Sequence, residues 1–289
     1  MRSMPHASDS PADWPSFDAA SRPEFGRPPV VEVVLSCQFS PLMTLGMPHV
    51  GLLWDRYRLE FTEFEDKPAL PHVVEHFGPS RPSSLEFRVV TEPAPERAWF
   101  KTKNGTHMLQ IQRDRFILNW RRSNWTEPYP RYPSVKKRFI DNFNRFDEFV
   151  NDFALGVIEP DQCEVTYVNH IYVDEHLDSL GQLERILQPW SGNRSDDFLS
   201  APEEAAAQAK FRISDVKGNP IGRLHIKAEP RLIIGSGRQL IQLTLTARGA
   251  PHSASLSGVL AFFDLGREYV VRGFTSITTL DMHKAWERQ

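Results

Sequence analysis

The sequence predicts an α+β fold in which a curved antiparallel sheet carries two long helices on one face, with the two halves related by internal duplication. Short runs rich in Val, Ile, Leu and Phe, separated by turn residues, are typical of antiparallel strands. Two longer segments repeat apolar residues at spacings of three and four, which indicates amphipathic helices. A meander of strands precedes each long helix, and this repeated order indicates the duplication.

The N-terminal residues 1–26 differ in composition from the rest of the chain. They are rich in Pro, Ser, Ala and Asp and lack the apolar centre of a secretory signal. Such a segment buries too little apolar surface to offset the entropy lost on ordering, so we expect a disordered tail. The folded part then comprises a first α+β half, residues 27–173, and a second half, residues 174–289. These halves form either one compact unit or two repeats.

The first half is expected to begin with a strand and a helix. Pro28 and Pro29 hold the chain extended ahead of residues 30–39, a β-branched, apolar run that is typical of a central strand. Residues 49–61 place apolar side chains at helical spacing and predict an amphipathic helix. Residues 85–91 predict the next strand.

A hairpin and a long helix follow. Asn104-Gly105 is a dipeptide typical of a two-residue type I′ turn, in which both residues have positive φ. Ser134 is expected to cap the helix. The elements predicted in this part are strands at 99–103, 106–112, 116–121 and 163–173 and a helix at 134–153.

The second half has the same order in a looser form. Thr278 is expected to cap the last helix, with Asp281 in the first turn, where a carboxylate interacts favourably with the helix dipole. The elements predicted here are a short helix at 180–187, a hairpin of strands 210–216 and 221–228, a strand at 240–247, a long helix at 257–274 and a final helix starting near 278.

Composition and charge bound the class of function. No run approaches the roughly 18 apolar residues that a membrane-spanning helix needs, so we expect a cytoplasmic protein without a membrane partner. Cys37 and Cys163 fall in predicted strands; we prefer two thiols in a reducing cytosol, with a disulfide as the alternative. Residues 101–145 contain 11 basic and 3 acidic residues, and residues 147–204 contain 14 acidic and 2 basic. These blocks are either two solvated faces or surfaces for partners of opposite charge.

Three short segments resemble a known family. They are the opening PPVVEVV at residues 28–34, VTYVNHI at 165–171, and the ending with Ile277-Thr278-Thr279, Met282-His283 and Trp286. Their order and spacing resemble a sporadically distributed family of uncharacterised bacterial proteins of similar length, over about residues 28–289. The resemblance implies bacterial origin and assigns no activity.

One motif in the chain carries enzymatic chemistry. Residues 72–76 spell H-x-x-E-H, in which two histidines one helical turn apart bind zinc and the glutamate acts as base. Prolines at 71, 79 and 82 leave too short a helix for that site, so a surface turn is the preferred interpretation. We therefore assign no catalytic residue, metal ligand or cofactor, lean against an enzyme, and keep a metal-dependent hydrolase as a remote alternative.

Two polar residues stand out on the predicted strand 163–173. Asn169 lies on its apolar face and must find hydrogen-bond partners. It either clamps a neighbouring backbone, the preferred interpretation, or contacts a ligand. His170 lies on the opposite face, where it lines a groove or belongs to an exposed polar surface.

Arginines lie close to aromatic residues between 101 and 145. Arg121, Arg122, Trp125 and Arg131 are the binding residues we select there. Such a pattern is used by protein interface hot spots and by proteins that stack single-stranded nucleic acid. Since the sequence pI is about 6.4, we favour an acidic protein partner over nucleic acid. The sequence thus predicts a non-catalytic binding protein of unknown specificity in the bacterial cytosol.

Overall fold

The computed structural model describes residues 11–78, 97–123 and 128–289 of the chain. It mixes helices and strands, as the sequence predicts. The strands are β1 Val30–Phe39, β2 Glu63–Lys67, β3 Arg97–Lys101, β4 His107–Gln112, β5 Arg115–Arg121, β6 Pro160–Tyr172, β7 Ala207–Ser214, β8 Pro220–Leu232 and β9 Gln239–Gly249. The α-helices are α1 Met47–Tyr57, α2 Arg131–Asp152, α3 Val173–His176, α4 Leu256–Ile277 and α5 Leu280–Ala285, with 3-10 turns at Ala19–Ser21 and Leu183–Arg185.

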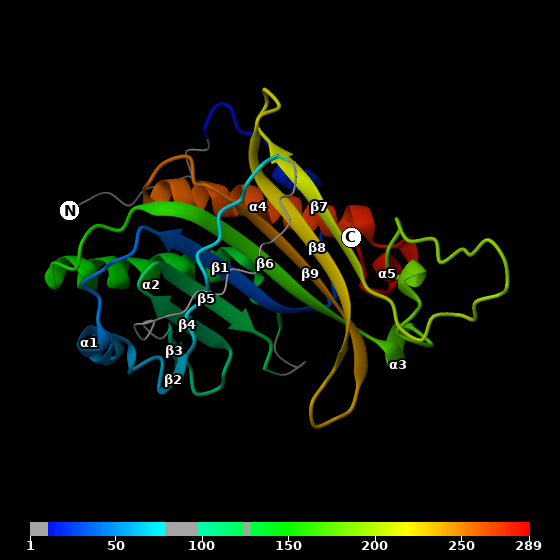
Figure 1. Cartoon of the computed structure of the whole chain (residues 1–289), viewed down its shortest axis with the longest axis horizontal. Helices are drawn as coiled ribbons and strands as arrows, with labels where there is room; N and C mark the ends of the chain where they lie inside the picture. Colours follow the sequence, from blue (N-terminus) through cyan, green and yellow to red (C-terminus); the bar gives the residue numbers. More distant parts are fainter. Residues whose placement is uncertain (1–10, 79–96, 124–127) are drawn as a thin grey trace. The chain divides into compact units, whose positions relative to one another are not determined.

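The strands form one antiparallel sheet of nine strands that does not close into a barrel. Their order is β2-β3-β4-β5-β1-β6-β9-β8-β7 (Figure 1). The antiparallel sheet and the α+β class predicted from the sequence are therefore confirmed.

The chain divides into two compact units. Unit 1 contains residues 1–33, 164–248 and 263–289, and unit 2 contains residues 34–163 and 249–262. The unit boundaries fall inside β1, β6, β9 and α4, so the units differ from the expected sequential halves, 27–173 and 174–289. These long elements therefore contribute residues to both units.

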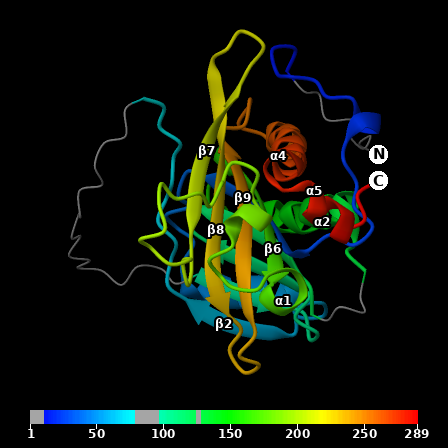
Figure 2. The same ribbon diagram turned by 90° about the vertical axis from the view of Figure 1, so that its right-hand side faces the viewer.

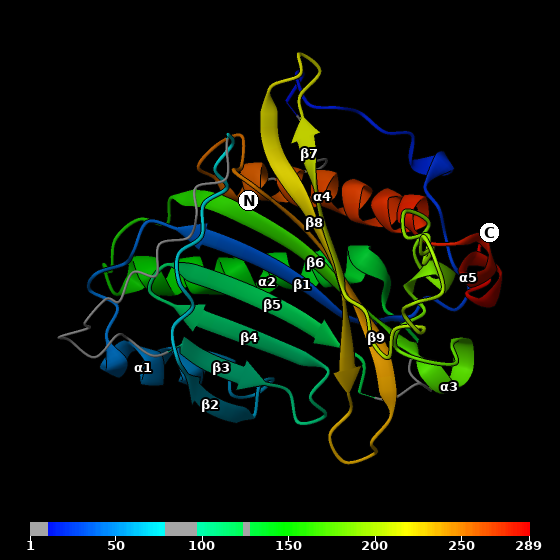
Figure 3. The same cartoon turned by 45° about the vertical axis from the view of Figure 1, so that its right-hand side comes forward.

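In unit 2, helix α2 packs on the sheet through phenylalanines. The Phe116 ring of β5 stacks on Phe146 with centroids 5.5 Å apart, and meets Phe139 and Phe143 edge-on at the same distance. Phe39 of β1 lies 6.1 Å from Phe146. Figure 3 shows α2 behind β5 and β1. Aromatic rings thus fill the space between this helix and the strands.

In unit 1, helix α4 lies very close to β6, β8 and β9, and Figure 2 views this helix along its axis. A Cβ atom on Gly266 would meet Val165 at 3.0 Å, and one on Gly273 would meet Leu224 at 2.6 Å. Glycine at these positions lets the helix backbone approach the strands. Unit 1 therefore relies on close backbone approach where unit 2 uses stacked rings.

The N-terminal residues 11–26, expected to be disordered, pack against unit 1; residues 1–10 lie outside the described part. Phe25 is buried against Phe274 and Trp286, with ring centroids 5.5 and 6.3 Å away. Trp14 is buried as well, and the Asp13 carbonyl accepts a hydrogen bond from the Val216 backbone at 2.8 Å. Two widely spaced aromatic anchors are enough to order a segment whose average composition indicates disorder.

Most predicted elements are present, with differences at their ends. Strand 30–39 is confirmed residue for residue as β1, and the long helices begin or end within three residues of their predicted bounds. The first helix begins at Met47 and ends at Tyr57, four residues early, and residues 180–187 form only a 3-10 turn. The predicted strand 85–91 lies outside the described residues.

One turn and two cap assignments were wrong. Ser134 does not cap α2, which begins at Arg131 with Pro130 as its N-cap. Gly105 has positive φ but Asn104 does not, so the hairpin is not type I′. Instead the Gly105 N–H donates to the Thr102 carbonyl at 2.8 Å, and the Asn104 side chain accepts from the Thr106 N–H at 3.2 Å. The cap of α5 is Thr279, which accepts from the Met282 N–H at 3.4 Å, since the Thr278 hydroxyl donates to the Phe274 carbonyl.

Candidate functional site

Four neighbouring strands of unit 2 each contribute one buried polar side chain at the same end of the sheet. They are Gln112 of β4, Arg115 of β5, Gln38 of β1 and Gln162 of β6, which we call the polar row. Their exposed fractions are between 0% and 5%. A buried polar group must be hydrogen-bonded or it destabilises the fold, so each member needs a partner.

Strand alternation places the polar row on the face opposite α2. Phe116 and Phe39 point to the helix, so their neighbours Arg115 and Gln38 point away from it. Gln112 pairs directly with Arg115 in the antiparallel register and shares its face. The row therefore lies on the surface that α2 leaves uncovered.

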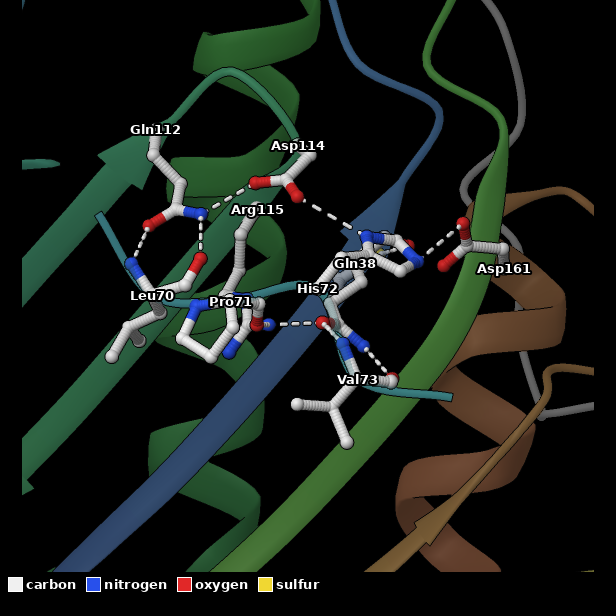
Figure 4. A network of polar contacts seen from close by, with 10 residues as sticks. Gln38, Leu70, Pro71, His72, Val73, Gln112, Asp114, Arg115 and Asp161 are labelled. Carbon is white, nitrogen blue, oxygen red and sulfur yellow. Dashed lines mark hydrogen bonds and ion pairs between the residues drawn. The ribbon is translucent and has the colours of Figure 1, made fainter. Parts of the chain in front are cut away.

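Residues 68–77, which we call the strap, pass over the polar row as an irregular extended segment (Figure 4). Leu70 donates its N–H to Gln112 Oε1 and accepts from Gln112 Nε2, both at 3.0 Å. Val73 makes the same pair of bonds with Gln38, at 3.0 and 2.7 Å. Gln112 and Gln38 thus each bind both the N–H and the carbonyl of one strap residue.

The other two members of the row bind the strap once each. Arg115 donates to the Pro71 carbonyl at 2.8 Å and also to Gln38 Oε1. Gln162 Oε1 accepts from the Glu75 N–H at 3.1 Å. The strap is therefore held on each of four adjacent strands.

The spacing of the strap contacts matches the spacing of the strands. Three inter-strand gaps of about 4.8 Å give about 14 Å from β4 to β6. The five residue-to-residue steps from Leu70 to Glu75 span roughly 15 Å in an extended polyproline-like chain. An extended chain laid across the strands therefore meets one member of the row after another without strain.

The strap histidine lies between two carboxylates. His72 Nδ1 is 3.1 Å from Asp114 and Nε2 is 3.2 Å from Asp161. Burial raises the pKa of Asp161, and the nearby His72 opposes that rise. These contacts add an electrostatic component to a strap otherwise held through its main chain.

The H-x-x-E-H motif lies in this strap and has no helix. In an extended segment, residues four apart are separated by about 13 Å, so His72 and His76 cannot bind one ion. His72 itself lies between the carboxylates of Asp114 and Asp161. The geometry does not support the metalloprotease interpretation.

Two of the arginines selected from the sequence, Arg122 and Arg131, lie close to aromatic rings in unit 2. The Arg122 guanidinium lies 5.8 Å from the Trp120 ring centroid, Trp120 lies 5.1 Å from Tyr129, and Arg131 lies 5.8 Å from Tyr129. Together with the exposed Arg121, these residues form what we call the arginine–aromatic cluster. Trp125 lies outside the described residues.

Asn169 and His170 lie on the part of β6 that belongs to unit 1, seven and eight residues after Gln162. Asn169 is buried and donates to the Leu243 carbonyl of β9 at 3.0 Å, so it clamps a neighbouring strand. His170 is half-buried, and burial lowers its pKa. The Tyr172 ring lies 6.1 Å from His170, and Arg238 covers that ring at 3.9 Å.

Unit 1 also has a partly open pocket of about 370 Å³. Phe17 of the N-terminal segment and Tyr269 of α4 form part of its wall. Its acid, Glu268, is already paired with Arg22 and Arg272. The pocket thus offers a largely apolar wall and a neutralised carboxylate.

Sequence reasoning missed the polar row. Its members lie at positions 38, 112, 115 and 162, so no local spacing joins them. The only available signal was a glutamine or arginine inside or beside a strand-forming run, as at Gln38 and Gln112. Nothing in a single sequence shows that these residues meet on adjacent strands.

Comparison with protein families and with curated proteins gives no match to this chain. The resemblance to an uncharacterised bacterial family stays a prediction. Across residues 11–78, 97–123 and 128–289, the helices are all too short or too polar to cross a membrane.

Proposed function

We propose that this chain is a non-catalytic binding protein that engages an acidic protein partner through the arginine–aromatic cluster. The observation that carries the proposal is the layered order Arg122, Trp120, Tyr129, Arg131. Cations held against rings lose little side-chain freedom on binding, and arginine and aromatic residues dominate interface hot spots.

Backbone strain supports the same cluster. Arg131 has φ of 64°, in the left-handed region that non-glycine residues rarely adopt. It is the first residue of α2, and its N-cap Pro130 makes no side-chain cap hydrogen bond. Strain of about 1 kcal/mol or more is often retained where a side chain must be aimed for function.

The charges around the cluster favour a protein over nucleic acid. Lys101 pairs with Glu63 and Glu65, Lys137 with Asp141, and both Arg138 and Arg145 with Glu60. Four of the eleven basic residues between 101 and 145 are therefore paired with carboxylates within unit 2. A nucleic-acid footprint needs many cations aimed at phosphates, whereas a protein hot spot needs a few anchored ones.

The test uses the full chain, a labelled peptide rich in Glu, Asp and Tyr, and a labelled oligothymidine. We expect the peptide to bind and the Arg121→Glu, Arg122→Glu, Arg131→Glu triple variant to lose at least tenfold in affinity, with little change in melting temperature. The matched control reverses three exposed lysines of unit 1, Lys210, Lys227 and Lys284, and should bind as the wild type does.

Salt distinguishes the two partner classes. Tighter binding of the oligothymidine, weakening steeply with salt, would transfer the proposal to nucleic acid. Equal peptide affinity in both triple variants would show that the cluster is only a solvated surface.

The internal duplication and the packing of both long helices on one face belong to this proposal too. The order β3, β4, β5, α2 matches β7, β8, β9, α4, and both helices have 22 residues. The preceding strands β1 and β6 each lie beside the last strand of their own meander, β5 and β9. Bacterial origin is proposed on the ground of the resemblance, and the cytosol as the location is a proposal that rests on the composition of the sequence.

A further inference from the structure

We propose that the polar row is a main-chain recognition site for an extended segment of a partner protein, and that the strap occupies it within the chain. This inference concerns a different surface from the arginine–aromatic cluster and does not depend on it. It rests on three observations: the main-chain hydrogen bonds that hold the strap, the Gln162 amide group that the strap leaves without a hydrogen bond, and the exposure of the strap side chains.

The chemistry of the row is that of a peptide backbone. A glutamine side chain has the same amide donor and acceptor as the main chain. Gln112 and Gln38 each use both groups on one strap residue, as a neighbouring β-strand would. Proteins that bind extended peptides commonly obtain affinity from such main-chain bonds.

Six of the ten strap residues are exposed. Pro71, His72, Val74 and His76 are exposed, and Leu70 is half-buried. Apart from the contacts of His72 with Asp114 and Asp161, the polar bonds described above all involve main-chain atoms. A different sequence in the same conformation would therefore satisfy the row.

The strap does not use the whole row. Gln162 is 1% exposed, and its Nε2 has no hydrogen-bond partner among the described residues. Its Oε1 is bound by the Glu75 N–H, so the strap supplies the donor of a third clamp but not the acceptor. A segment that also presents a carbonyl to Gln162 would complete the clamp.

The row defines what the partner must present. The segment must be extended and must have free N–H groups at the positions of Leu70, Val73 and Glu75. Proline is acceptable at the position of Pro71, because Arg115 binds only its carbonyl. The row therefore selects a partner by the positions at which its main chain must have an N–H and those at which it may carry proline, rather than by charge.

A tethered strap competes with any such partner. Tethering gives the strap a local concentration of the order of millimolar, so wild-type protein should bind a free peptide weakly. Weakening the strap should expose the row and raise the affinity for the peptide.

The experiment uses full-length protein and a fluorescent peptide with the sequence of residues 68–77, PALPHVVEHF. Val73→Pro removes the N–H that Gln38 binds, and we expect at least tenfold tighter peptide binding than in the wild type. Adding Gln38→Met to this variant should reverse the gain. A peptide N-methylated at the residue equivalent to Val73 should also lose at least tenfold.

His76→Pro is the matched control, because His76 contributes no N–H to the row and the variant should bind as the wild type does. His72→Ala is a milder variant that keeps the strap main chain, and it should raise affinity several-fold. It tests the same inference if Val73→Pro does not fold. The inference is overturned if neither variant binds more tightly, or if N-methylation has no effect.

Discussion

Two irregular segments of this chain pack on their units in opposite ways. The N-terminal segment, residues 11–27, is held by buried rings such as Trp14 and Phe25 and by Arg272, which donates to the Asp18 carbonyl at 2.9 Å. The strap, residues 68–77, exposes most of its side chains and is held through main-chain atoms by Gln38 and Gln112.

The difference determines what each segment tolerates. A segment held by buried rings depends on its sequence and contributes apolar burial to stability. A segment held through its main chain depends on conformation, tolerates substitution, and exchanges water for protein hydrogen bonds at little net gain. The first should behave as part of the core and the second as a local, reversible attachment.

The largest effect should come from removing a buried ring. Phe25→Ala leaves a cavity beside the Phe274 and Trp286 rings, and we expect the free energy of unfolding to fall by about 3 kcal/mol. Chemical denaturation measures this. Phe17→Ala is the control, since Phe17 is 37% exposed and should lose about 1 kcal/mol or less. Equal losses would contradict side-chain anchoring.

A smaller, local effect should follow from breaking one clamp. Gln112→Leu removes both bonds to Leu70, and we expect amide exchange at Leu70 to accelerate about tenfold, or about 1.4 kcal/mol. Global stability should change little, because the strap opens separately. Gln208→Leu on β7 is the exposed control; a large fall in melting temperature caused by Gln112→Leu alone would show that the strap belongs to the cooperative core.

The smallest effect should come from pH, with opposite signs in the two segments. Burial, then Arg288, lowers the pKa of His283, whose ring packs 5.8 Å from Phe25. Arg288 donates to Nδ1, so the neutral ring carries its hydrogen on Nε2, facing Thr278. A lowered histidine pKa gives stability above the ordinary value near 6.5 that is lost as pH falls.

Asp161, the β6 carboxylate that contacts His72 of the strap, behaves in the other direction. Because the pKa of Asp161 is raised, its contribution is largest below its ordinary pKa and declines as pH rises through the raised value. Acidification below pH 6.5 should therefore speed amide exchange at Phe25. Protonation of Asp161 should not loosen the strap. His283→Asn should remove the response at Phe25, and an unchanged response would assign it to another group.

The sequence predicted the elements with long, uniform patterns. Strand β1 was found from a continuous β-branched, apolar run, and helices α2 and α4 from apolar residues repeated at helical spacing. The docked N-terminal segment was missed because its anchors are too widely spaced to form a pattern. The hairpin type was missed because the Asn104 side chain, bonded to Thr106, stabilises a different turn.

The candidate sites show the same limit. Arg122 and Arg131 do lie against aromatic rings close to them in sequence, but the selection of Arg121, Arg122 and Arg131 as binding residues stays a prediction. The polar row could not be found, because it requires the order β4-β5-β1-β6, which no local pattern contains. A strap held by its backbone also leaves no signature in its own side chains.

The two edge strands of the sheet, β2 and β7, affect whether copies of this chain associate at high concentration. Four of the five residues of β2 are charged, in the sequence EFEDK. At the other edge, β7 carries Lys210 and Arg212 and has an irregular register at Ile213 and Ser214. Charges and irregularities at a sheet edge oppose the edge-to-edge pairing from which fibrils grow. Concentrated solutions of the chain should therefore resist fibril formation, and another polypeptide is more readily accepted across the strands than alongside them.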